Sequence, residues 1–144
     1  MDAMKRNRRT RILVNGAAKL RSSLAAAIIA SNTVLVIEPP TEGLVMLTVE
    51  DTARGSLFHL GELLVTESKA RIGQTLGLGI VAGSNPKAAW ELAVIDAAFN
   101  AGLPQTEGWE RLLRQEEERL KAEQAREDGR ILLTRVDFKN MELT

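Results

Sequence analysis

The sequence predicts an α+β fold, in which an N-terminal helix or helix pair precedes a four-stranded antiparallel sheet and two C-terminal helices. Between about Thr33 and Ala82, apolar residues alternate with period two and short turns separate the runs, which is typical of an antiparallel meander. On either side, apolar residues recur at spacings of three and four, which is typical of amphipathic helices. The 144 residues are enough for one hydrophobic core, so we expect a single domain over residues 1–144.

The N-terminal helix is predicted by apolar residues at helical spacing, namely Leu13, Ala17, Leu20, Leu24 and Ile28. Asn15-Gly16 weakens this helix in its middle and favours a split into two pieces.

A basic N-terminal segment, residues 1–10, leads into this helix. Five basic residues crowd the stretch from Lys5 to Arg11, and Asp2 is the only acid before Glu38. Such a segment can bind nucleic acid or other phosphates. No aromatic residue interleaves with the arginines, so we favour a solvated terminus or a docking segment for an acidic neighbour and do not expect nucleic acid as a partner.

The first two predicted strands are Val34–Glu38 and Leu44–Thr52. Both are rich in β-branched and aliphatic residues. Pro39-Pro40 is expected to stop the first strand, and the sequence "PPTEG" is expected to form the turn between them.

The third predicted strand, Phe58–Ile72, is long and is expected to bulge near Glu67-Ser68. Gly73-Gln74 suits a type II′ hairpin turn, because glycine tolerates the first central position of that turn. The fourth strand then ends at Ala82.

A helix apolar nearly all the way round is predicted over Pro86–Ala101. Ser84 or Asn85 can cap its start, and Gly102 ends it. One sheet covers only one side of such a helix, so we expect the N-terminal helix or a second chain on the other side.

The last predicted helix runs from about Thr106 to Asp128 and is followed by an extended segment over residues 130–144. Gly129 is expected to end the helix. Because its apolar seam is thin after Leu113, we expect this helix to project outward or to lean on another chain.

Composition excludes several classes of site. The chain has no Cys and a single His, His59, so it cannot build a thiolate zinc site, an iron–sulfur cluster or a complete Ser-His-Asp triad alone. We therefore expect no metal, no cofactor and no self-sufficient catalytic residue in this chain. No apolar run is long enough to span a bilayer, and the absence of Cys fits a reducing cytoplasm.

The glycine-rich sequence "GLGIVAG" does not predict a dinucleotide site. Gly77 and Gly79 lie inside a predicted strand, and no βαβ unit follows them. Glycines at alternate strand positions more often allow a backbone or a ligand to approach one face closely.

Three charged residues are candidates for function or for structural ion pairs. Glu62 lies among apolar residues on the third strand, and Arg71 lies farther along it, so together they can line a polar cleft or form an ion pair at the sheet edge. Asp96 lies away from the solvent-facing stripe of its helix. It can bind substrate, although an ion pair with Arg71 or Arg135 is the reading we favour.

Several sequence blocks, in this order, resemble one protein family. They are "TEGLVML" (Thr41 to Leu47), "FHLGELLVTESKARI" (Phe58 to Ile72), "GLGIVAGSNPKAAWELAVIDAA" (Gly77 to Ala98), and the tail "TRVDF" with Met141. The chain resembles PhnG, the G subunit of the carbon–phosphorus lyase core complex, over roughly Leu13 to Met141. No single block is a catalytic signature, but their order and spacing are specific.

The resemblance implies a bacterial protein of phosphonate utilisation. In that family the G subunit assembles with the H, I and J subunits in a two-fold symmetric complex. With the I, H and L proteins it supports formation of α-D-ribose 1-methylphosphonate 5-triphosphate from ATP and methylphosphonate, with release of adenine. ATP is then a co-substrate of the complex, and Glu62 and Arg71 are this chain's candidate substrate-binding residues.

Two other functions remain open from the sequence. The chain can be a purely structural scaffold that contacts no substrate, in the same or another complex. A nucleic-acid binder acting through the basic N-terminal segment is weaker. Whichever function holds, we expect the isolated chain to form a homo-oligomer, because its apolar segments need another surface to bury them.

Overall fold

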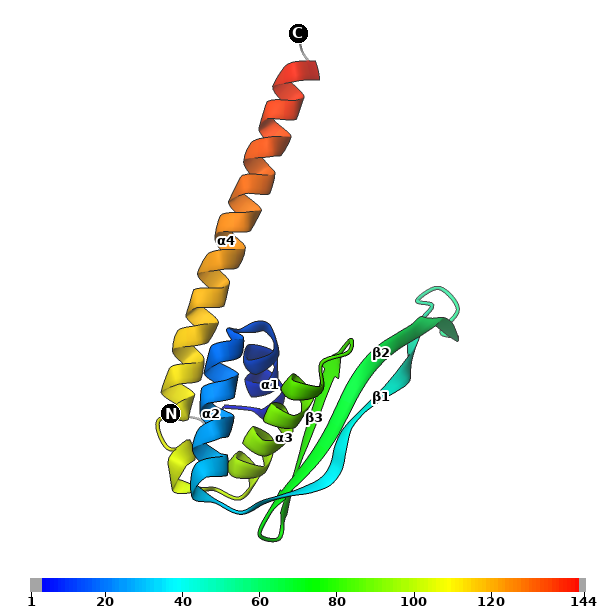
Figure 1. Cartoon of the computed structure of the whole chain (residues 1–144). Coiled ribbons are helices and arrows are strands. Elements are labelled where there is room, and N and C mark those ends of the chain that lie inside the picture. Colours follow the sequence, from blue (N-terminus) through cyan, green and yellow to red (C-terminus); the bar gives the residue numbers. More distant parts are fainter. Residues whose placement is uncertain (1–3, 143–144) are drawn as a thin grey trace.

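The computed structural model describes residues 4–142, and side chains as far as residue 132. This part of the chain contains four α-helices, a short 3-10 helix and three strands (Figure 1). In chain order they are α1 (Arg6–Asn15), α2 (Ala18–Ser31), β1 (Val34–Glu50), β2 (Leu57–Ile72), β3 (Thr75–Ala82), α3 (Pro86–Asn100), η1 (Pro104–Thr106) and α4 (Trp109–Glu142). The helices and the antiparallel pairing agree with the predicted α+β class.

The prediction of a four-stranded sheet is wrong, because the described chain forms three strands in the order β1-β2-β3. The first two predicted strands are one continuous strand, β1, and Pro39-Pro40 lies within it. Neither proline has a register partner on β2, and β1 has no strand on its other side in the described chain, so no ladder pairing depends on the missing proline N–H groups. The prolines cause a shift in register between Glu38 and Thr41 and do not stop the strand.

The bulge predicted in the third strand near Glu67-Ser68 is not found at that position. β2 pairs with β3 without interruption from Val65↔Ala82 to Ile72↔Thr75, so β2 does not bulge at Glu67-Ser68. The extra residue there belongs to β1. β2 has its own extra residue at Leu60, since Leu47 pairs with Gly61 and Thr48 with His59.

Helix α3 lies against one face of the sheet, and two glycines of β3 bring it close. A Cβ atom at Gly77 would lie 2.2 Å from the carbonyl oxygen of Ala93, and one at Gly79 would lie 2.0 Å from that of Ala89. Only a residue without a side chain permits this distance. The alternate glycines therefore serve the approach of a backbone, which is one of the two uses that the sequence predicts.

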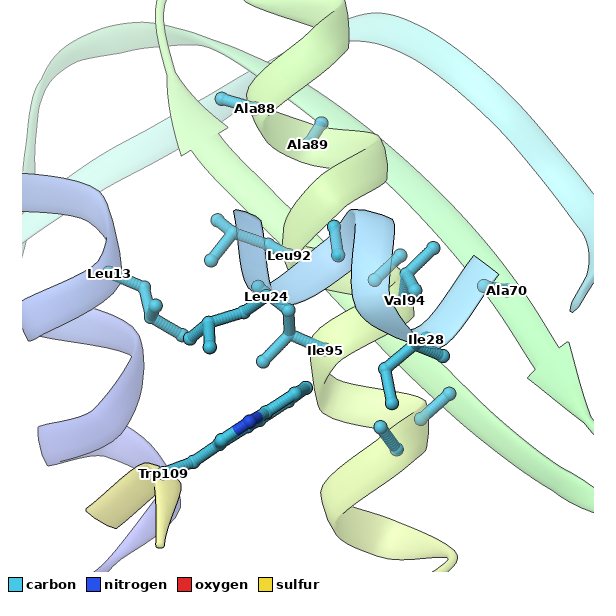
Figure 2. Close-up of a cluster of buried hydrophobic side chains, with 14 of the residues drawn as sticks. Leu13, Leu24, Ile28, Ala70, Ala88, Ala89, Leu92, Val94, Ile95 and Trp109 are labelled. Atoms are coloured by element: carbon cyan, nitrogen blue, oxygen red, sulfur yellow. The ribbon is translucent and has the colours of Figure 1, made fainter. Parts of the chain in front are cut away.

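The other side of α3 is covered by α2, which answers the question of what this apolar helix is buried against. Side chains of α1, α2, α3 and α4 converge on one core (Figure 2). Ile28, Ile95 and Leu113 are among its fully buried members. A buried pair also joins the two helices, with 3.7 Å between Arg21 Nε and Glu91 Oε1. Glu91 is therefore buried between the two helices and does not face solvent.

Two elements extend beyond this core (Figure 1). The paired ends of β1 and β2 form a hairpin that projects from the body, and α4 projects as a single long helix. The prediction of an extended segment after Gly129 is wrong, because α4 continues through that residue to Glu142. An exposed glycine inside a helix costs only about 1 kcal/mol, which does not force an end. Over the described residues, no single helix is long and apolar enough to cross a membrane, and only α1 with α2, bent by 119°, would suffice by length and composition.

Candidate functional site

The two predicted substrate-binding residues both lie on β2, but the structure does not bring them together. Glu62 and Arg71 are nine residues apart, which corresponds to about 30 Å along a strand. Because nine is odd and the strand is regular between them, their side chains lie on opposite faces of the sheet. Within one chain they are two separate candidates and not one polar cleft.

Arg71 lies on the outer face of the sheet, which is the face turned away from α3. Its neighbours in register are Leu35 on β1 and Leu76 on β3, both exposed leucines. The Nε atom of Arg71 is buried and has no hydrogen-bond partner within the described chain. A guanidinium without a carboxylate partner is suited to bind a phosphate or a phosphonate.

The neighbouring base on this face is already paired. Lys69 Nζ lies 3.1 Å from a carboxylate oxygen of Glu38 and 3.8 Å from one of Glu67. The hydrogen bond that Lys69 donates to Glu38, followed by the negative charges of Glu38 and Glu67, raises the pKa of Lys69. Arg71 is therefore the better placed of these two cations to attract an anion from outside the chain.

Glu62 is exposed on the hairpin, opposite Met46 of β1. His59 lies nearer the tip, opposite Thr48, and is also exposed. A lone exposed imidazole does not by itself make a catalytic centre.

Asp96 is the centre of a buried polar cluster. The sequence favoured an ion pair for Asp96, but it did not identify the correct partners. Its Oδ1 atom accepts hydrogen bonds from Arg6 Nε at 2.9 Å and from an Arg9 terminal nitrogen at 3.0 Å. Its Oδ2 atom accepts from Arg6 at 2.6 Å and from the backbone N–H of Leu78 at 2.9 Å. Asn100 also donates to Oδ2 at 3.4 Å. The lone pairs of this carboxylate are thus occupied, which favours a structural role over substrate binding.

The predicted ion-pair partners of Asp96 are therefore replaced by Arg6 and Arg9. Arg71 lies on the far face of the sheet, and the side chain of Arg135 is outside the described residues. Burial lowers the pKa of Arg9, and the charge of Asp96 opposes this shift. The signal for these partners is the spacing of Arg6 and Arg9, which puts two bases on one helix face within a segment nearly free of acids.

The basic N-terminal segment docks on acids of its own chain. Besides the Asp96 pairs, Arg8 forms an ion pair of 2.5 Å with Glu117 on α4, and the backbone N–H of Met4 donates to Glu110. The sequence favoured docking of this segment on an acidic neighbour, and the acids that it contacts belong to α3 and α4 of the same chain. These pairings leave little of the segment for nucleic acid, although residues 1–3 lie outside the described part.

The loop before α3 forms an ordinary helix cap. Asn85 accepts a hydrogen bond from the backbone N–H of Ala88, and Thr66 Oγ1 accepts from the N–H of Asn85. Ser84 donates to a carboxylate oxygen of Glu42. A carboxylate at this position opposes the binding of a phosphate at the helix start.

The residues that the structure describes hold no cluster of three or more metal-binding side chains. A hollow of about 600 Å³ between α1 and α4 has a lining of both acids and bases, including Arg11, Glu117 and Lys121. It offers no convergent acid, base and nucleophile. The described part of the chain thus presents a buried Nε atom without a hydrogen-bond partner at Arg71, and no self-contained catalytic site.

The geometry of the described residues does not indicate a protein family, so we compared the sequence with known proteins. A search of curated proteins finds no match. The model of one protein family, described as phosphonate metabolism protein PhnG, matches residues 4–142. This match covers nearly the whole chain, including all four helices and all three strands, and the chain therefore belongs to the PhnG family.

Proposed function

We propose that this chain is an accessory subunit of the carbon–phosphorus lyase system, working with the H, I and J subunits and the L protein. In this proposal it supports the formation of α-D-ribose 1-methylphosphonate 5-triphosphate from ATP and methylphosphonate, with release of adenine. The observation that carries the proposal is the family match over residues 4–142, which gives a role in phosphonate metabolism.

The proposed reaction requires several different groups to meet at one site. A phosphonate oxygen attacks the anomeric carbon of the ribose, the bond from that carbon to the adenine nitrogen breaks, and adenine leaves with a proton. Such a step needs an acid for the base, negative charge near the cationic sugar and positive charge for the triphosphate. Of these, we assign to this chain the positive charge of Arg71, whose Nε atom is buried without a hydrogen-bond partner. The remaining groups therefore come from partner subunits in this proposal.

Arg71 is our candidate for direct contact with substrate. Its guanidinium would pair with oxygens of the triphosphate or of the phosphonate when a partner closes the outer face of the sheet. Glu62, about 30 Å away by its place on the strand, would contact a ribose hydroxyl only at a different position in the assembly. ATP is the co-substrate, and the proposal needs no metal or cofactor in this chain and places it in the cytoplasm.

The test is reconstitution with the cognate H, I and L proteins, ATP and methylphosphonate. Alone, the chain should release no adenine from ATP. Added to its partners, it should turn hydrolysis of the nucleotide into transfer onto the phosphonate, which phosphorus NMR of the products distinguishes. Equal yields of the ribose phosphonate with and without the chain would refute the accessory role.

A purely structural scaffold is the alternative, and Arg71→Ala separates it from substrate binding. If Arg71 contacts substrate, the variant should weaken transfer while the complex stays intact by gel filtration, and Arg71→Lys should restore part of the yield. An intact and fully active Arg71→Ala complex would favour the scaffold and remove Arg71 from the site.

A further inference from the structure

The chain exposes much more surface than a compact protein of its size. Its accessible surface is 9978 Å². A compact monomer of 15.8 kDa exposes about 7,300 Å² by the usual scaling of surface with mass. The difference, roughly 2,700 Å², is of the size that stable protein interfaces bury.

A large part of the exposed apolar surface lies on the projecting hairpin. We define the hairpin arm as residues 43–64, which form the outer ends of β1 and β2 and the turn between them (Figure 1). Ten large apolar side chains are exposed on it: Leu44, Val45, Met46, Leu47, Val49, Leu57, Phe58, Leu60, Leu63 and Leu64. Two strands without a third partner or a packed face are marginally stable in water.

The apolar residues of the hairpin arm lie on both of its faces. On β1, Leu44, Val45, Met46 and Leu47 are consecutive, so their side chains point alternately to the two sides. A flat partner surface would cover only one of these sides. The shape therefore fits a groove that closes around the hairpin arm, or two surfaces that meet there.

The charged residues of the hairpin arm indicate which charge the partner's groove should carry. The acids of the hairpin arm are Glu50, Asp51 and Glu62, and its one base, apart from His59, is Arg54. Glu50 and Glu62 form no ion pair within the described chain. Two copies of this arm side by side would place like charges together, whereas a border of Lys or Arg would complement them.

We propose that the hairpin arm inserts into a groove of a different protein subunit, lined by apolar side chains and bordered by Lys or Arg. The proposal rests on the proposed function, which supplies the candidate partners as the other subunits of the phosphonate complex. Burial of the ten apolar side chains provides the affinity, and the acids fix the orientation of the hairpin arm.

Matched substitutions test the apolar part. Val45 on the hairpin arm and Ile29 on α2 are exposed apolar residues of similar accessibility, 45% and 47%. Val45→Glu should weaken binding to the assembled partner subunits by about tenfold or more, because it places a charge in an apolar groove. Ile29→Glu should bind as the native chain does. Neither side chain belongs to the core, so circular dichroism and thermal unfolding should match the native protein for both.

The charge is tested at Glu50. Glu50→Lys should weaken binding more than Glu50→Gln, and the difference should shrink as salt is raised, since salt screens exposed charges. A photo-crosslinking side chain in place of Leu63 should join the chain to one different subunit within the complex, and one in place of Ile29 should not.

The proposal is overturned if the crosslink from position 63 joins only a second copy of this chain, or if Val45→Glu binds the partners as tightly as Ile29→Glu. These results are separable from failure of the proposed function. If transfer requires the chain but Val45→Glu leaves both the complex and transfer intact, the docking proposal is rejected and the accessory role stands. If assembly depends on the hairpin arm but the chain has no effect on transfer, the accessory role is rejected and the docking proposal stands.

Discussion

Asp96 holds together three parts of the chain that are distant in sequence. It lies on α3, accepts hydrogen bonds from two arginines of α1, and accepts another from the backbone N–H of Leu78 on β3. Asn100, one turn later, donates to the carbonyl oxygen of Leu76. These two side chains satisfy backbone groups at the free edge of β3, which would otherwise be open to pairing with another strand.

Asp96→Asn should destabilise the chain by about 3 kcal/mol, because it leaves the buried guanidinium of Arg9 without its negative partner. Arg6→Ala is the matched control. The Arg6 side chain is 56% exposed, so its loss should cost less than about 1 kcal/mol. Urea unfolding followed by circular dichroism measures both. Equal effects of the two substitutions would show that Asp96 is not the centre of the cluster.

The sequence identified Asp96 as an acid that needs a cation, but it did not identify the cations. Hydrophobic spacing indicates which face of a helix is buried, and it carries no information on which distant helix covers that face. Arg6 is 90 residues from Asp96, and the two meet only because α1 packs near the C-terminal end of α3, beside the first residues of β3. The same limit applies to Glu62 and Arg71, since a shared strand indicates neither their distance to a partner nor the shape of a cleft.

At the scale of elements, the contact of α3 with β3 depends on glycines that leave no room for a side chain. Gly79→Ala should cost about 3 kcal/mol or more, since the new methyl group would overlap the carbonyl of Ala89 and move the helix backbone. Gly43→Ala is the control, because a Cβ atom there meets nothing within 4 Å and its φ is not in the left-handed region. Thermal unfolding of both variants is the measurement. A Gly79→Ala protein as stable as Gly43→Ala would contradict the close approach.

The docking of α1 on α4 should depend on pH through Glu117. The hydrogen bond from Arg8 lowers the pKa of Glu117 below its ordinary value of 4.5. A lowered pKa in the folded state means that this pair contributes stability above pH 4.5, and the contribution is lost as the pH falls through the folded-state pKa. The native chain should therefore melt at a higher temperature than Glu117→Gln at pH 7, and the gap should close below pH 4.5. A gap that is independent of pH would contradict an ionic contribution.

Two elements were mispredicted for related reasons. Residues that usually end an element are tolerated where the local backbone accommodates them. Pro39-Pro40 does not interrupt β1, since both prolines lie in a register shift where β1 makes no pairing with β2. Gly129 does not end α4, since an exposed helix tolerates the moderate cost of one glycine. The boundaries predicted at Pro86 and Gly102 hold to within a residue or two, because proline is tolerated in the first turn of α3 and Gly102 adopts a positive φ just after its last turn.

At the scale of the whole molecule, a well-packed body carries two projecting elements. The body was the predictable part, because the periodicity of its helices and strands reflects burial within the chain. The hairpin arm was less predictable, because its run of apolar residues is the pattern of a strand buried on both faces, although the chain leaves them uncovered. An interface with another molecule leaves the same sequence pattern as a core.

The isolated chain should not behave as a compact monomer. The ten exposed apolar side chains of the hairpin arm favour self-association, so sedimentation at low micromolar concentration should give species larger than 15.8 kDa that grow with concentration. Val45→Glu should reduce this association, whereas Ile29→Glu should leave it unchanged. A single compact species of monomer mass at all concentrations would contradict the expectation.

The central claim is that this PhnG-family chain is a subunit whose surface is completed by different chains of a phosphonate complex. Native mass spectrometry of the complex purified after co-expression with the cognate H, I and J subunits tests it most directly. We expect one assembly that contains this chain together with those subunits, and loss of this chain from it when Val45→Glu is introduced. An assembly of the other subunits that forms without this chain, while the chain itself stays a free monomer, would contradict the account.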